Sequence, residues 1–95
     1  MMLNYNSTPE TLYKKARKVE LEAMQLYLNA CEAIATACTA TAPYVFTAYS
    51  EAENGLRCRY LDLLGFVIDA EDERALNALI SARTFLDIVR RRLFP

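Results

Sequence analysis

Glycine and proline are so scarce in this chain that long, uninterrupted helices are the structures best suited to it. Two glycines and three prolines are present among 95 residues, whereas a β-rich fold needs turn-forming residues about every ten positions. Hydrophobic residues make up 54% of the chain, and many of them are alanine, the strongest helix former. Because a chain of this length forms one domain, we expect residues 1–95 to fold as a single all-α bundle.

Capping residues and proline divide the chain into three long predicted helices. Ser7 and Glu10 have the spacing of a capping box at the start of the first helix, and Pro43 suits the first turn of the second. Gly65 loosens the chain after the second helix, and Asp69 is the predicted cap of the third. The predicted helices cover about residues 9–40, 43–66 and 70–93. Short connections make successive helices antiparallel, so the expected topology is up-down-up.

Each predicted helix carries an inner stripe of apolar residues, mostly at steps of three and four. In the first helix, alanine recurs in this stripe every seven residues, at positions 16, 23, 30 and 37. Small residues at one seam position let a neighbouring helix approach more closely than usual, and we interpret Gly55 in the second helix as part of the same close contact. The expected stripes are Leu12, Ala16, Val19, Ala23, Leu26, Ala30, Ala33, Ala37 and Ala40 in the first helix; Val45, Ala48, Tyr49, Ala52, Leu56, Tyr60, Leu63, Leu64 and Val67 in the second; and Ala75, Leu79, Ala82, Leu86, Val89 and Leu93 in the third.

Two basic clusters are candidate electrostatic contacts for a nucleic acid. They comprise Lys14, Lys15, Arg17 and Lys18 in the first helix and Arg90, Arg91 and Arg92 at the end of the third. Clustered cations of this kind bind phosphates. The up-down-up topology, however, places the first cluster next to the acidic residues of 69–73 and the second cluster at the opposite end of the bundle. The formal net charge of −1 adds no general attraction, so nucleic-acid binding is an alternative function that requires a dimer.

The side chains most often used for catalysis or cofactor binding are rare in this sequence. The chain contains no histidine, which removes Ser-His and Cys-His nucleophiles and nearly all zinc chemistry. Cys31, Cys38 and Cys58 form no CxxC pair and are interpreted as buried, reduced thiols. The register of the first two helices brings Glu32 near the carboxylates of residues 51 and 53. We predict a non-enzymatic protein with no catalytic residue, metal, cofactor or small-molecule substrate.

The charge-poor segment of residues 30–49 indicates a second covering surface. A helix in a three-helix bundle normally carries charge on its outer side, but beyond Ala30 the first helix is apolar or hydroxylic almost all round. Such an end is typical of a protein that self-associates or docks onto another. The candidate residues of this partner or dimer surface are Ile34, Ala35, Cys38, Tyr44 and Tyr49. We expect a homodimer that buries this surface.

The function that fits these features is a small protein–protein interaction module, such as an adaptor, a chaperone or an inhibitor of a larger protein machine. It acts through an apolar helix face on another, unidentified protein. The alternatives are a dimeric nucleic-acid-binding regulator that uses both basic clusters, and a purely structural oligomeric bundle. No window of the sequence is long and apolar enough to span a membrane, and the first ten residues lack the pattern of a secretory signal. The sequence therefore predicts a cytoplasmic protein.

Overall fold

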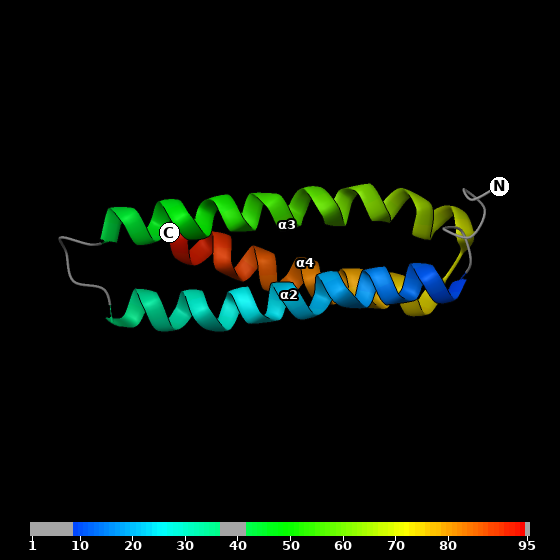
Figure 1. Ribbon diagram of the computed structural model, residues 1–95, viewed down its shortest axis with the longest axis horizontal. Coiled ribbons are helices and arrows are strands. Elements are labelled where there is room, and N and C mark those ends of the chain that lie inside the picture. Colours follow the sequence, from blue (N-terminus) through cyan, green and yellow to red (C-terminus); the bar gives the residue numbers. More distant parts are fainter. Residues whose placement is uncertain (1–8, 37–41, 95) are drawn as a thin grey trace.

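The protein is an all-α bundle in which three helices lie side by side. The computed structural model describes the backbone of residues 9–36 and 42–94, and the side chains of residues 11–36 and 46–94. The helices are α2 (Pro9–Thr36), α3 (Ala42–Ala70) and α4 (Glu73–Leu93). Figure 1 shows α2 and α3 running in opposite directions along the long axis, with α4 returning beside both. Every pair of helices is in contact, which confirms the expected up-down-up bundle.

The inner stripe of α2 is confirmed over the part of the helix that the structure describes. Its buried members are Leu12, Ala16, Val19, Ala23, Leu26 and Ala30. Ala33 is half-buried, and positions 37 and 40 lie outside the described residues. The side chains of Ala16 and Ala23 are fully buried, so alanine at every seventh position does form the seam that faces the other helices.

The end of α3 differs from the prediction, because the helix continues through Gly65 and ends at Ala70. Neither glycine of the chain has a positive φ, so Gly65 does not terminate the helix. The chain reverses at Glu71, which adopts the left-handed conformation with a φ of 54°. The backbone N–H of Glu71 donates to the carbonyl of Ile68 and that of Asp72 to Val67, at 3.0 and 3.3 Å. These two bonds form a Schellman motif that satisfies the last carbonyls of α3.

The predicted cap of the third helix was also wrong. Asp69 belongs to the last turn of α3, and the helix begins three residues later than that cap implied. Asp72 is the N-cap of α4, and its Oδ1 accepts a hydrogen bond from the backbone N–H of Ala75 at 3.1 Å. A capping aspartate satisfies one of the free N–H groups at a helix start, and the turn at Glu71 leaves Asp72 as the residue in that position.

The inner face of α3 is rotated from the expected one. Leu56, Tyr60 and Val67 are buried as predicted, but Ala48 and Ala52 are exposed. Tyr49, Leu63 and Leu64 are half-buried, and Val45 lies outside the described side chains. The place expected for Ala52 is taken by Glu53, whose side chain is 2% exposed. The buried seam of α3 runs through positions 53, 56, 60 and 67, and the carboxylate of Glu53 is accommodated there because Arg57 and Arg90 pair with it.

The inner face of α4 matches the predicted stripe along its whole length. All six expected residues are buried: Ala75, Leu79, Ala82, Leu86, Val89 and Leu93. Ala78 is buried beside them, and the tilted rings of Tyr27 and Phe85, with centroids 5.5 Å apart, join α2 to α4. None of the three described helices combines the length and the hydropathy required to cross a bilayer.

Candidate functional site

Of the five residues predicted to form a partner or dimer surface, the three whose side chains the structure describes do not form one exposed face. Ile34 and Tyr49 are half-buried and pack against the hydrophobic core of the bundle. Ala35 is exposed on α2, whereas Cys38 and Tyr44 lie outside the described side chains. A charge-poor helix end is therefore not the same as an exposed one, because part of its apolar surface is used within the same chain.

The first exposed apolar surface lies on the outer side of α2. Leu21, Met24 and Leu28, here called the α2 ridge, are 42%, 37% and 51% exposed. Their steps of three and four residues place them on one side of the helix. That side is opposite the buried alanines of the α2 seam, so the ridge faces away from the bundle.

The second exposed apolar surface lies on α3 and α4. Leu61, Ile68 and Ile80, here called the α3/α4 patch, are 56%, 55% and 52% exposed. The hydrogen bond from Arg57 Nη2 to Asp87 Oδ1, 2.8 Å long, sets the antiparallel register of the two helices.

Counting along both helices from that hydrogen bond places Leu64 alongside Ile80 and Ile68 alongside Leu76. Leu64 and Leu76 are half-buried and pack against the core, so they form the base of the patch. The patch lies towards the end of the bundle where α3 connects to α4, because Ile68 is two residues before the end of α3 and Ile80 is seven residues after the start of α4. Phe66 and Phe94 are exposed elsewhere.

The first basic cluster is exposed on α2. Arg17 pairs with Glu20 of its own helix, and this hydrogen bond raises the pKa of Arg17 above its ordinary value. Among the described residues, no ion pair joins Lys14, Lys15 or Lys18 to an acidic residue. Nearness to the acidic residues of 69–73 does not require ion pairs, so the expected weakening of the local field stays a prediction.

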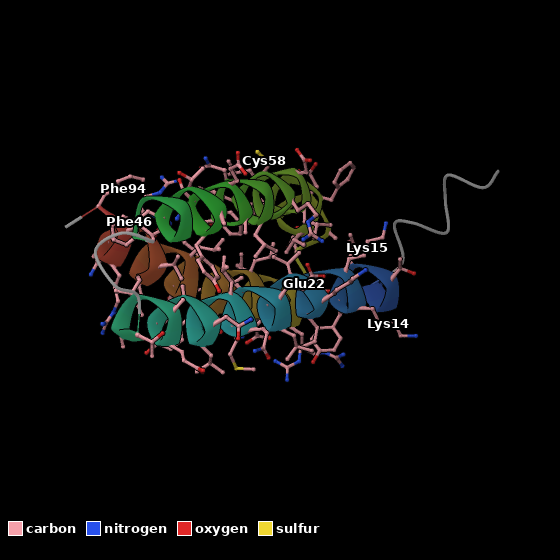
Figure 2. All side chains as sticks on the ribbon, turned by 60° about the vertical axis from the view of Figure 1, so that its left-hand side comes forward. Lys14, Lys15, Glu22, Phe46, Cys58 and Phe94 are labelled. Atoms are coloured by element: carbon pink, nitrogen blue, oxygen red, sulfur yellow. The ribbon has the colours of Figure 1, made fainter. Side chains whose placement is uncertain are left out.

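The second basic cluster begins with an arginine that pairs with the buried Glu53, although the Arg90 side chain itself is 45% exposed. Arg90 Nη2 donates to Glu53 Oε1 at 2.8 Å, and Arg57 Nε donates to Glu53 Oε2 at 2.7 Å. Arg91 and Arg92 are exposed. Figure 2 shows Phe94, just beyond them, at the opposite end of the bundle from Lys14 and Lys15, so the two basic clusters of one protomer are separate, as predicted.

Glu53, Arg57, Asp87 and Arg90 form one charge network between α3 and α4. Burial acts to lower the pKa of Arg57, but its hydrogen bonds with Asp87 and Glu53 outweigh that effect and raise the pKa above its ordinary value. Arg83 also approaches Asp87, at 3.6 Å. The sequence-based reasoning missed this network because its expected stripe for the second helix passed through Ala52 and not through Glu53. The signal that could have found it is the seven-residue spacing of position 53 with the buried position 60.

The carboxylates of the predicted group and the cysteines differ in their burial. Glu32 and Glu51 are exposed, whereas Glu53 is enclosed by arginines. Cys31 is half-buried and Cys58 is exposed, and both are free thiols, so burial was the wrong expectation for Cys58 (Figure 2). In the part of the chain that the structure describes, no group of three or more Cys, Asp and Glu residues is placed to hold a metal ion.

Gly55 borders an open groove and not a close helix contact. A Cβ atom at this position would meet nothing within 4 Å. The groove, about 670 Å³ in volume, is lined by Gln25 of α2 and by Ala52 and Gly55 of α3, among others. Arg59 of α3 crosses to Glu22 of α2 beside it. Ala52 and Gly55 leave their part of the groove open, because neither carries a long side chain.

The fold and these surfaces define a three-helix bundle with apolar residues exposed on two separate sides. Comparisons with models of known protein families, with curated proteins and with solved structures found no match to this chain.

Proposed function

We propose that this protein is a non-catalytic interaction module that binds another protein through the α3/α4 patch. The observation that carries the proposal is the grouping of Leu61, Ile68 and Ile80, each more than half exposed, across two neighbouring helices. Isolated apolar residues on a surface are ordinary, but contiguous ones mark interaction sites. An adaptor, a chaperone and an inhibitor of a larger protein machine all act by such binding.

The shape and charge of the patch favour one kind of partner. Leu64 and Leu76 form the base of a shallow strip between two helices, which suits the apolar side of an amphipathic helix. Arg83 lies at the edge of this strip, opposite Leu61 in the register of the two helices, and its side chain is 62% exposed. The proposed partner is therefore an amphipathic helix with an acidic residue beside its apolar face. The free thiol of the exposed Cys58 supports a reducing, cytoplasmic location.

Two double variants with equal changes in charge and polarity test the proposal. Ile68→Glu with Ile80→Glu alters the α3/α4 patch, whereas Leu21→Glu with Leu28→Glu alters the other exposed surface and is the matched control. Each variant is immobilised, proteins are captured from the native host, and the bound proteins are quantified by mass spectrometry. Helical circular dichroism checks that both variants are folded.

We expect a partner that is retained by the wild type and by the α2 control and is reduced about tenfold or more by the patch variant, because a charge buried against an apolar partner costs more than 1.4 kcal/mol. The purified partner should then bind the wild type with a negative heat-capacity change, the mark of apolar burial. Identical captured proteins for the wild type and the patch variant would contradict the proposal.

Nucleic-acid binding is the second candidate, and one observation favours it. Lys14, Lys15 and Lys18 are exposed and take part in no ion pair among the described residues, so they are free to contact phosphates. An electrophoretic mobility shift at low salt separates the two functions. A shift that weakens steeply with added salt and disappears on reversing all three charges to Glu supports the second candidate, whereas the proposed module gives no shift.

A further inference from the structure

The α2 ridge is continuous with charged residues that make the outer side of the helix self-complementary. Lys18, Gln25 and Glu32 are exposed and are spaced by seven residues, so they follow one side of α2 along the ridge. Lys18 carries a positive charge at one end of this row and Glu32 a negative charge at the other. Neither takes part in an ion pair among the described residues.

We infer that the α2 ridge is the interface of a homodimer in which the α2 helices of two copies lie antiparallel. The charges decide the direction. Lys18 and Glu32 are equally far from Gln25, so a two-fold axis near Gln25 places Lys18 of each copy beside Glu32 of the partner subunit. In a parallel pair the opposite charges are about 21 Å apart along the axis, and the Lys14–Lys18 clusters face each other.

The same axis pairs the apolar residues of the ridge. Leu21 lies beside Leu28 of the partner subunit, and Met24 lies close to the axis. Both copies contribute the same residues in the same way, as a two-fold interface requires. The inference goes beyond the proposed function, because it uses a different surface and a different occupant, namely a second copy of this chain.

The size of the ridge sets the expected strength of the dimer. The outer side of α2 from Lys14 to Ala35 is about 32 Å long, but only three large apolar side chains lie on it. An interface with only three large apolar side chains from each copy is expected to bury less than about 1,200 Å² in total, which is typical of transient complexes. We expect a dissociation constant on the order of 10–100 μM, in rapid exchange between monomer and dimer.

Sedimentation equilibrium of the full chain over micromolar to millimolar concentration measures this association. The wild type is expected to approach twice the protomer mass of 10.8 kDa. Leu21→Glu with Leu28→Glu should raise the dissociation constant about tenfold or more, because two leucines that pack across the axis are both replaced by carboxylates, which places like charges side by side. Ile68→Glu with Ile80→Glu, on the α3/α4 patch, is the matched control and should associate like the wild type.

A charge-swap experiment tests the antiparallel direction. Lys18→Glu and Glu32→Lys should each weaken the dimer about threefold by placing like charges together, and the double variant should return to within about twofold of the wild type.

The inference is overturned by a wild type that stays monomeric at millimolar concentration, by a ridge variant that associates like the wild type, or by a double swap no better than the single ones. If the wild type is monomeric but the Ile68→Glu with Ile80→Glu variant still loses the captured partner, the dimer is overturned and the proposed function stands. If the wild type dimerises but the α3/α4 patch variant captures the same proteins as the wild type, the proposed function is overturned and the dimer stands.

Discussion

Replacing Glu53 by alanine should be the most damaging polar substitution on α3. The Glu53 side chain is 3% exposed and accepts one hydrogen bond from Arg57 and one from Arg90. Truncation removes both bonds and leaves two guanidinium groups without their shared carboxylate. Removing one member of a buried ion pair is destabilising because the remaining charge is left uncompensated.

The magnitude follows from how much of the network survives the substitution. A hydrogen bond to a charged group contributes about 1.5–3 kcal/mol, and two are lost. Arg57 keeps Asp87 as a partner at 2.8 Å, and the Arg90 side chain is 45% exposed, so water compensates part of the loss there. We therefore expect a loss of about 2–3 kcal/mol in the free energy of unfolding, less than the roughly 3–5 kcal/mol of a fully buried pair.

Urea denaturation followed by circular dichroism measures this loss without the ionic screening that guanidinium salts add. In a thermal scan, the same change should lower Tm by roughly 10 to 20 °C in a domain of this size. Glu51→Ala is the matched control, because Glu51 is exposed on the same helix and should change stability by at most about 0.5 kcal/mol. Equal stabilities of the two variants would refute the reasoning that the network holds α4 against α3.

Four further substitutions test local features of the fold by urea denaturation. Ala30→Leu should destabilise by about 1–3 kcal/mol through overpacking of the α2 seam, whereas Ala35→Leu on the exposed side of α2 should be nearly neutral; equal effects would contradict the seam. Gly55→Ala should stabilise by about 0.5–1 kcal/mol, because alanine has a higher helix propensity than glycine and a Cβ there meets nothing within 4 Å. Glu71→Gly should stabilise by a similar amount, about 0.5–1 kcal/mol, because glycine adopts positive φ without strain; a loss would mean that the turn is held by the Glu71 side chain. Asp72→Ala should cost about 1 kcal/mol through the lost cap of α4, and no change would show that this hydrogen bond is not formed in solution.

The sequence was sufficient to predict the fold class and the inner faces of two helices. In α2 and α4, alanine and larger aliphatic residues form one stripe, and charged or polar residues occupy most of the other positions, so only one side can be buried. The buried residues Ala23 and Leu79 were predicted for this reason. The helix start at Asp72 was missed because two aspartates lie near the turn, and only the backbone reversal at Glu71 decides which of them caps α4.

The inner face of α3 and the candidate surfaces could not be predicted in the same way. Ala48 and Ala52 make the outer side of α3 apolar in sequence, so hydropathy does not distinguish its two sides. Glu53 is buried because Arg57 and Arg90 reach it, and Arg90 is 37 residues away along the chain. Which apolar residues remain exposed depends on how helices dock. Ile34 packs against the core, whereas Leu28, on the same helix, is exposed.

The two exposed apolar surfaces are placed so that their proposed uses do not compete. The α2 ridge faces away from the seam of α2, and the α3/α4 patch lies between the two helices on the other side of that seam. A dimer formed through α2 therefore leaves both copies of the patch open, on opposite outer sides of the assembly. Such a dimer presents two equivalent binding surfaces, each able to bind one partner helix independently of the other. Substitutions in the α2 ridge should therefore weaken the association of two copies and leave partner binding at the patch unchanged, which is why the ridge variant is the matched control for the proposed function.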